Sequence, residues 1–527
     1  MKKIFAIAIA SLVVTSIQAQ DINDALRYAQ TDLNGTARFR AMSGAFGALG
    51  GDFSSINVNP AGSVIFANNQ VGFTLGDSDT KNNSNYFGTN TSNRKNSFDL
   101  SQAGAVFVFN NYDKTSNWRK FAGSVNYEKS KNLDNSIFSA GTNPNNSVDN
   151  YFLSYANQNG GIPIELLQTQ PNETIQSLYT YLGGLPDSYY PNINGYQAQQ
   201  AFLGYQSYII DSATSSPTNT SYITNVANGG NYYQENRIKS TGYNSKLAFN
   251  FSSQYGDKWF FGLNLNSHFL DYRQSNSFFE TNSNPKYLTG STVDAIHFFN
   301  DLYTYGSGFS FNIGTIFKPV KEVRLGLAYE SATWYRLTDE LTQRVQTSGY
   351  GLNAPLNNTQ YTSNLVTDPN TTMIFQPYKL QTPSKLTGSF AYIFGKRGLI
   401  SFDYAVKNYS NTQYKPKGDF TGANKTMSDN LTSSSEVRLG AEYKIKKISL
   451  RGGYRWEQSP YKDGTTMGDL NSFSGGLGFN FGSTKLDLAY TNSKRNYNQQ
   501  FFSQGLTDPA RIKSVTNNVI LTLLFEL

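Results

Sequence analysis

From Thr241 to Leu527, short runs of this sequence alternate apolar and polar residues, and the gaps between runs are alternately short and long. Successive side chains of a β-strand point to opposite faces, so alternation with one apolar face predicts strands buried on one side only. Strands that face lipid outward and a polar lumen inward, joined by tight turns at one rim and long loops at the other, are typical of a transmembrane β-barrel. The sequence therefore predicts an all-β, antiparallel barrel.

About fourteen such runs can be traced, an even number as bacterial barrels have. In the run at 432–445, for example, Val437, Leu439 and Tyr443 share one face while Arg438 and Glu442 share the other. The approximate strand spans are 69–78, 98–111, 117–128, 237–254, 257–275, 305–319, 320–336, 383–395, 397–411, 432–445, 447–458, 470–482, 484–497 and 514–527.

The connections between these spans then alternate strictly in length. Tight links such as Lys446-Lys447 and Gly482-Ser483 are followed by long ones such as 79–97, 276–304 and 337–382. Short turns of bacterial barrels face the periplasm and long loops face outside, so we expect both termini to be periplasmic. The barrel is expected to span residues 69–527, and a soluble all-β array is the alternative.

The composition fits a barrel better than a large soluble core. Only 38% of the chain is hydrophobic, yet 15% is aromatic, and the mean hydropathy is −0.47. A barrel needs only a thin apolar band flanked by aromatic girdles. There is no cysteine, and the formal charge of +7 is spread widely without a Lys/Arg run that would indicate nucleic-acid binding. We expect the partners to include outer-membrane lipid and lipopolysaccharide instead.

The chain begins with the features of a secretory signal. Lys2 and Lys3 precede an apolar stretch from Ile4 to Ile17, and we expect cleavage after Ala19, which makes 1–19 a signal peptide. No other segment approaches the roughly 20 apolar residues that a membrane helix needs. An exported chain with barrel strands belongs in the outer membrane of a Gram-negative bacterium.

Residues 20–68 do not alternate and are expected to occupy the lumen. Asp21–Asn34 can form a short helix, and a glycine- and alanine-rich stretch runs from Ala37 to Asp52. A fourteen-stranded barrel is wider than the roughly eight-stranded size that its own side chains fill. Glycines allow the close backbone approach that a segment threaded through a barrel requires. A flexible linker is the alternative.

Two motifs in this segment carry a resemblance to a known family. The stretch Gly44-Ala-Phe-Gly-Ala-Leu-Gly-Gly-Asp52, followed by Asn59-Pro60-Ala61-Gly62, resembles the N-terminal hatch of the long-chain fatty-acid outer-membrane transporters of the FadL/TodX type. The resemblance implies a fourteen-stranded barrel plugged by a hatch that moves to admit hydrophobic ligands. The chain departs from the family pattern at Asp52–Ile56 and at its last residues, Phe525–Leu527. The hatch and gating residues implied are Gly44, Gly47, Gly50, Gly51, Asn59, Pro60, Ala61 and Gly62.

The connection 129–236 is too long for a simple rim loop and contains helical patterns at 148–158, 164–182 and 198–210. In the resembled family an extracellular loop with helices forms a hydrophobic groove. The candidates for ligand contact are Ile164, Leu167, Leu178, Tyr181 and Leu182. These residues could equally pack the loop onto itself, and the loop could dock a protein.

Four arginines at expected lumen positions could bind an anionic headgroup, since a guanidinium pairs well with a carboxylate. They are Arg324, Arg438, Arg451 and Arg455. Carboxylates occupy similar positions, namely Glu330, Asp403, Glu442 and Asp487, so a network of lumen ion pairs is the alternative.

Nothing in the sequence indicates an enzyme. The two histidines, His268 and His297, form no metal-spaced cluster, and there is no Gly-x-Ser-x-Gly elbow. We expect no catalytic residues, no metal and no cofactor. The leading hypothesis is passive uptake of hydrophobic or amphipathic molecules, long-chain fatty acids first, gated by the hatch. The alternatives are a secretion-accessory or structural surface barrel that docks exported proteins, and a general porin.

Overall fold

A computed structural model, which describes residues 21–113, 115–185, 190, 192–352 and 358–527, shows a closed barrel of fourteen antiparallel strands. Strand β1 (Gln70–Tyr86) pairs with β2 (Thr89–Asn110) on one edge and with the last strand, β22 (Ala510–Glu526), on the other. The predicted fold is therefore confirmed, whereas the predicted signal peptide, 1–19, lies outside the described residues. The other wall strands are β3 (Trp118–Asn132), β7 (Tyr232–Tyr255), β8 (Trp259–Asn282), β9 (Thr292–Phe317), β10 (Val323–Glu330), β15 (Lys385–Phe394), β16 (Gly398–Asn408), β18 (Ser433–Ile445), β19 (Ile448–Glu457), β20 (Leu470–Asn480) and β21 (Thr484–Gln499).

The predicted alternation sets which side chains face outward. On β8, Trp259, Phe261 and Leu263 are exposed on the outer surface, while Asn264 and Asn266 on the opposite face are buried in the lumen. An outer surface this apolar would be unfavourable in water and is stable only in lipid. The period-two pattern thus corresponds to the two faces of the wall.

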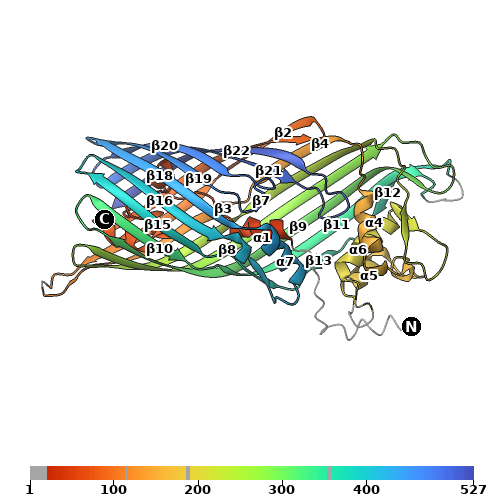
Figure 1. Ribbon diagram of the computed structural model, residues 1–527, viewed down its shortest axis with the longest axis horizontal. Coiled ribbons are helices and arrows are strands. Elements are labelled where there is room, and N and C mark those ends of the chain that lie inside the picture. Colours follow the sequence, from red (N-terminus) through yellow and green to blue (C-terminus); the bar gives the residue numbers. More distant parts are fainter. Residues whose placement is uncertain (1–20, 114, 186–189, 191, 353–357) are drawn as a thin grey trace.

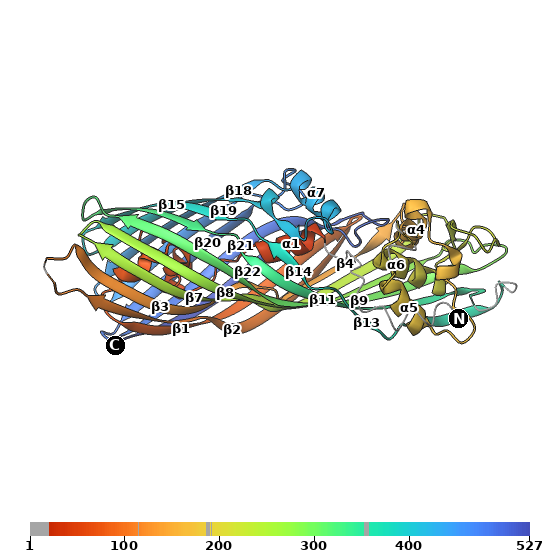
Figure 2. The ribbon, with the colours of Figure 1, turned by 90° about the horizontal axis from the view of Figure 1, so that it is seen from below.

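The barrel has two distinct ends, which we call the turn end and the loop end. The turn end carries the tight connections, such as Lys446-Lys447, and the C-terminus (Figure 1). The loop end carries helices and a sheet that extends well beyond the rest of the wall, formed largely by β7, β8, β9 and β11 (Trp334–Tyr350) (Figures 1 and 2).

The predictions of long loops at 79–97 and 276–304 are wrong, because the strands continue through most of these residues. β1 and β2 extend to a tight turn at Phe87-Gly88, and β8 and β9 leave only 283–291 between them. In these extensions both faces contact polar surroundings or other protein. Apolar–polar alternation disappears there, and with it the signal that the prediction used.

Several wall strands are interrupted near the loop end. The predicted strand 320–336 is broken between β10 and β11, which pair in turn with the same strand, β9. Shorter segments continue other strands in the same way: β4 (Asn135–Asn143) pairs with β7, while β14 (Tyr378–Gln381) and β17 (Gln413–Lys415) pair with each other. The remaining short strands are β5 (Ile210–Ser212), β6 (Tyr222–Thr224), β12 (Tyr361–Thr367) and β13 (Thr372–Ile374).

The helices of the loop end pack into one apolar cluster, which we call the loop core. Its helices are α4 (Asp149–Asn157), α5 (Ile175–Gly183) and α6 (Gly195–Gln206), with 3₁₀ turns at Gln158–Gly160 and Ile164–Leu166. The predicted helix at 164–182 is therefore two elements. A further helix, α7 (Thr421–Asn430), follows a 3₁₀ turn at Tyr409–Asn411. Within the described residues, no helix is both long and apolar enough to span a bilayer.

Candidate functional site

The N-terminal segment lies inside the barrel, where it is the red chain in Figures 1 and 2. We call residues 21–68 the plug. It contains the helices α1 (Ile22–Ala29), α2 (Ala37–Ala41) and α3 (Ser55–Val58) and the 3₁₀ helix η1 (Pro60–Ile65). The predicted short N-terminal helix is confirmed as α1, which begins with a capping box at Asp21.

The plug glycines stand where a side chain could not fit. Gly50 has φ +63°, and a Cβ atom on it would lie 2.8 Å from Gly62 Cα, so the two glycines bring the two halves of the plug together. A Cβ on Gly47 would lie 2.0 Å from Ser389 Oγ of the wall. Gly44 and Gly51 also adopt positive φ, at +74° and +67°. The glycine motif is thus explained by close packing within the lumen.

Asn59 joins the two halves of the plug to the wall. Its Nδ2 donates to Gly47 O at 2.7 Å and to Thr315 O at 3.0 Å, and its Oδ1 accepts from Ala61 N at 3.1 Å. Pro60 begins η1 at the position where a missing N–H costs nothing. The Asn59–Gly62 motif is therefore a junction between the glycine stretch, the turn that follows and strand β9.

Wall glycines, which the sequence reasoning missed, make room for this junction. A Cβ on Gly262 would lie 2.2 Å from Pro60 C, and one on Gly314 would lie 2.2 Å from Asn59 Oδ1. Gly440 and Gly453, which pair across β18 and β19, leave the same kind of space for Met42. The sequence did contain a signal for this contact. Most inward positions of the alternating strands carry polar side chains, and glycine at such a position indicates that another segment packs closely against the wall.

Side chains of the wall also bond the plug backbone directly. Buried Asp403 accepts hydrogen bonds from Phe46 N at 3.0 Å and from Gly47 N at 3.1 Å. Asn250 Nδ2 donates to Pro60 O at 2.9 Å, and Asn264 Nδ2 donates to Ile56 O at 2.8 Å. The plug is therefore held by polar contacts spread along its length.

The plug carries one ion pair to the wall and one internal buried carboxylate. Arg38 Nε lies 2.8 Å from Glu442 Oε2. Asp52 accepts from Thr36 Oγ1 at 2.8 Å and from Ser54 N at 2.9 Å. Burial raises the pKa of Asp52 above its ordinary value, although Arg38 and these hydrogen bonds oppose the rise.

The four predicted lumen arginines all have protein partners. Arg324 Nη1 donates to Leu49 O of the plug at 2.6 Å. Arg438 pairs with Glu436 at 2.7 Å, and its Nη1 lies 3.4 Å from Gly44 O.

The remaining two belong to ion-pair networks between neighbouring strands. Arg451 bridges Glu442 and Asp487 at 2.7 and 2.5 Å, and Arg455 bridges Glu436 and Glu457 at 2.6 Å each. The structure thus contains the ion-pair network that the sequence left as the alternative. A ligand contact by any of the four arginines stays a prediction.

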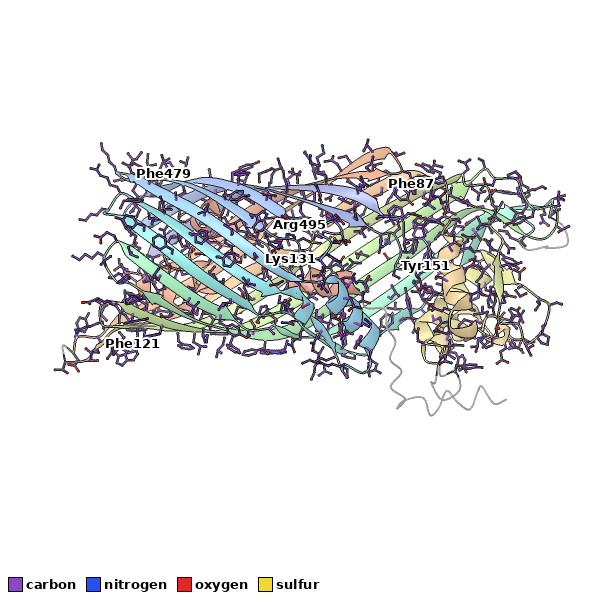
Figure 3. The ribbon with its side chains drawn as sticks, viewed as in Figure 1. Phe87, Phe121, Lys131, Tyr151, Phe479 and Arg495 are labelled. Atoms are coloured by element: carbon purple, nitrogen blue, oxygen red, sulfur yellow. The ribbon has the colours of Figure 1, made fainter. Side chains whose placement is uncertain are left out.

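A cavity of about 280 Å³ lies between the plug and the wall. Its lining is polar apart from Leu33, Gly76, Met467, Leu470 and Tyr497. Two of its lining residues, Lys131 and Arg495, appear near the middle of the barrel in Figure 3. Basic side chains outnumber acidic ones: the basic residues are Arg40, Lys129, Lys131, Arg455, Lys494 and Arg495, and the acidic residues are Asp32, Asp99 and Asp134.

Arg40, on the plug helix α2, is the least satisfied of these cations. It is 4% exposed, its Nε has no hydrogen-bond partner, and its Nη2 lies 3.5 Å from Thr491 Oγ1. It forms no ion pair with a residue in the described part of the chain. Burial lowers the pKa of Arg40 to about 10, which leaves the guanidinium charged at neutral pH. Sequence reasoning missed Arg40 because only the tertiary structure reveals that it lacks a partner.

Beside this cavity, part of β2 forms no backbone ladder with the neighbouring strand β3. β2 pairs with β3 only from Gln102 to Asn110, whereas its residues 89–100 pair with β1 alone. Side chains bridge this interval: Lys129 Nζ lies 2.6 Å from Asp99 Oδ2, and Asn132 Nδ2 donates to Ser97 Oγ at 2.7 Å. Asp99, Lys129 and Asn132 also line the cavity, so the cavity extends to this interval.

The predicted ligand residues of the loop are mostly buried in the loop core. Leu167, Leu178 and Leu182 have no exposed surface, Ile164 is 4% exposed, and Tyr181 packs at the edge. The structure contains the packing of the loop onto itself that was the alternative prediction. Contact between these residues and a ligand stays a prediction, and for the four buried residues it requires the loop core to open.

The histidines lie apart in the wall. His268 Nε2 is within 2.8 Å of Ser310 Oγ, and His297 Nε2 is within 2.7 Å of Ser277 Oγ. No group of three or more potential metal ligands occurs among the described residues.

Comparison with known proteins gives a family and a fold. The family model described as outer membrane protein transport protein (OMPP1/FadL/TodX) matches residues 212–519. A solved structure of a Pseudomonas aeruginosa FadL homologue is 12% identical and aligns over 94% of this chain and 99% of its own, with a TM-score of 0.51. The Pseudomonas putida toluene transporter TodX is 13% identical with the same coverage and a TM-score of 0.48. No curated protein matches the chain.

The family model covers more than half of the chain, and the match to the Pseudomonas aeruginosa structure shows a shared fold. The chain belongs to the OMPP1/FadL/TodX family of outer membrane transport proteins.

Proposed function

We propose that this barrel is an outer-membrane channel for passive uptake of amphipathic molecules with an apolar chain and an anionic head, such as long-chain fatty acids. The observation that carries this proposal is the unpaired, buried Arg40 beside a cavity whose basic side chains outnumber its acidic ones. A buried charge without a partner is unfavourable, so binding of an anionic group would be correspondingly favourable. A polar cavity of this size suits the headgroup of an amphipathic molecule better than a neutral hydrocarbon.

In this proposal the plug is the gate. Arg40 lies on α2, which precedes the glycine stretch, and Asn59 ties that stretch to β9. An anion that draws Arg40 toward it would therefore act on the segment that fills the lumen. The gating residues are those of the glycine motif and Asn59–Gly62. Wall residue Asp403, which accepts from the plug backbone, and Asn250, which donates to it, favour the closed position.

The interval between β2 and β3 is the exit that fits the cavity best. Only side chains bridge it, and breaking two side-chain contacts costs less than separating a ladder of backbone hydrogen bonds. A ligand that leaves between β2 and β3 would move sideways through the wall into the surrounding lipid, and would not pass through the turn end.

We place the turn end in the periplasm and the loop end outside, with both termini periplasmic and lipid and lipopolysaccharide around the apolar band. Tight turns on the periplasmic side and longer connections outside are the usual arrangement of bacterial barrels. A constantly open porin fits less well, because the plug is bonded to the wall at many points along the lumen.

Uptake of radiolabelled oleate by cells lacking the gene, with and without the gene restored on a plasmid, tests this proposal. Restoration should increase uptake several-fold, while uptake of a hydrophilic solute such as glucose should stay unchanged. Equal oleate uptake with and without the protein would refute the proposal. Equal increases for oleate and glucose would favour a general porin.

A further inference from the structure

Three basic side chains stand in a row across three adjacent strands of the barrel. Arg336 on β11 is directly opposite Lys379 on β14, and Lys379 is directly opposite Lys415 on β17. Directly opposite residues of antiparallel strands lie within about 5.5 Å of each other at the backbone, so their side chains are neighbours. We call these three residues the basic row.

The basic row faces outward. The residues that alternate with it, Tyr335, Tyr378 and Tyr414, are buried among the apolar residues on the inner side. Arg336 and Lys379 are exposed, and Lys415 is half-buried. Because successive side chains of a strand point to opposite faces, the three cations lie on the surface that meets the surroundings of the barrel.

The row lies just past the apolar band, toward the loop end. Trp334, the preceding outward residue on β11, is exposed and stacks with Phe311, whose ring is 6.5 Å away. Exposed Phe309 lies opposite Trp334 on β9, and Leu325 and Leu327 continue the apolar surface on β10. Trp334 therefore belongs to the aromatic rim, and the basic row sits one step beyond it, at the depth where lipid headgroups lie.

The protein itself offers the row no acidic partner. None of the three cations forms an ion pair with any residue in the described ranges, and Lys415 Nζ donates to the neutral Gln381 Oε1 at 2.6 Å. Arg237, another outward cation of the loop end, differs in this respect, because it lies 3.8 Å from the ring of Phe138 and 3.1 Å from Glu235. Like charges placed directly opposite destabilise a sheet, so the row would gain from an external anion.

We propose that the basic row binds a phosphate group of lipopolysaccharide in the outer leaflet. This inference uses the orientation proposed above, in which the loop end faces outside, but not the ligand or the gating mechanism. A guanidinium gives two parallel donors to phosphate oxygens, and the two ammonium groups supply further charge on the same side. The adjacent Trp334 and the apolar band below it would contact the acyl chains of the same lipid.

Binding of purified, bisphosphorylated lipid A to the detergent-solubilised barrel, measured by native mass spectrometry, tests this inference. The test variant is R336Q/K379Q/K415Q. The matched control is K396Q/K446Q/K447Q, which removes the same charge from exposed lysines of the turn end. The fourteen-stranded wall should remain folded in both, which the heat-dependent shift of the band on a denaturing gel would report.

The wild type and the control should bind lipid A equally, and the test variant should bind it at least about tenfold more weakly. This difference should shrink when the probe is lipid A stripped of its phosphates. Wild-type affinity in the test variant, or equal losses in both variants, would overturn the inference. Oleate uptake by the same variants separates the two proposals, because the basic row can fail as a lipid site while the channel still takes up oleate.

Discussion

The plug and the loop core are both irregular segments attached to a regular barrel, but they are held in different ways. The plug meets the wall through many separate polar contacts, such as those of Asp403, Asn250 and Asn264 with its backbone, and through several smaller, separate apolar clusters. The loop core is one continuous apolar cluster that includes wall residues such as Phe278 and Phe298.

This difference indicates which part moves. The separate contacts of the plug can be broken one at a time, and water or a ligand can replace the polar ones, whereas opening one continuous apolar core exposes all of its surface at once. We therefore expect the plug to be the mobile element and the loop core to be a rigid cap on the extended sheet.

Removal of the carboxylate that holds the glycine stretch should open the channel. In D403A two buried plug amides, those of Phe46 and Gly47, lose their acceptor, at about 1–3 kcal/mol each. Conductance in planar bilayers should rise about tenfold or more above the wild type. The control is D429A on α7, an exposed residue paired only with Lys425, which should conduct like the wild type. Unchanged conductance in D403A would mean that these hydrogen bonds do not keep the lumen closed.

A substitution that creates a cavity in the loop core should destabilise this core without opening the channel. Leu203 is fully buried in this core, and L203A should destabilise it by about 2–5 kcal/mol. Limited proteolysis of the loop should become faster, while conductance stays at the wild-type level. L288A, at a side chain that is 94% exposed, serves as the control for proteolysis. A conductance increase in L203A comparable with that in D403A would contradict the assigned roles of the two regions.

Removal of the positive charge of Arg40 should reduce the uptake of anionic molecules and leave the uptake of neutral ones nearly unchanged. R40Q should reduce oleate uptake by about tenfold, the loss expected for a hydrogen bond to a charged group, and leave uptake of oleyl alcohol nearly unchanged. R40K should retain part of the oleate uptake. R94Q, at a mostly exposed arginine near the β1–β2 turn, is the control. Equal losses for oleate and oleyl alcohol in R40Q would show that Arg40 supports the plug rather than recognises an anion.

The sequence predicted the parts of the fold in which the two faces of a strand have different surroundings. Strand β8 was predicted over 257–275 because its outward side chains from Trp259 to Phe269 meet lipid on one face, and its last residues, up to Asn282, were missed because neither face meets lipid there. The plug was recognisable from its glycines and Asn59, since close backbone packing admits few other residues. The contacts that hold it, such as Asp403 to Gly47, join residues far apart in the chain and leave no local pattern.

The candidate site was less predictable for the same reason. The sequence placed Arg451 and Arg455 in the lumen with an ion-pair network as one explanation, but it could not identify partners on other strands, such as Asp487 for Arg451. Arg40 showed the reverse: nothing in the sequence distinguishes it from Arg38, yet Arg38 pairs with Glu442 and Arg40 remains unpaired. Pairing between distant charges cannot be read from spacing along the chain.

A reversible tether between plug and wall tests the central claim most directly. Ser63 Oγ of the plug lies 2.6 Å from Ser252 Oγ of β7, and the chain has no cysteine, so S63C/S252C introduces a single possible disulfide. Oleate uptake by this variant should be blocked under oxidising conditions and restored by a reducing agent, while S63C alone responds to neither. Wild-type uptake by the fully cross-linked variant would show that cargo crosses the barrel without movement of the plug, and would contradict the account.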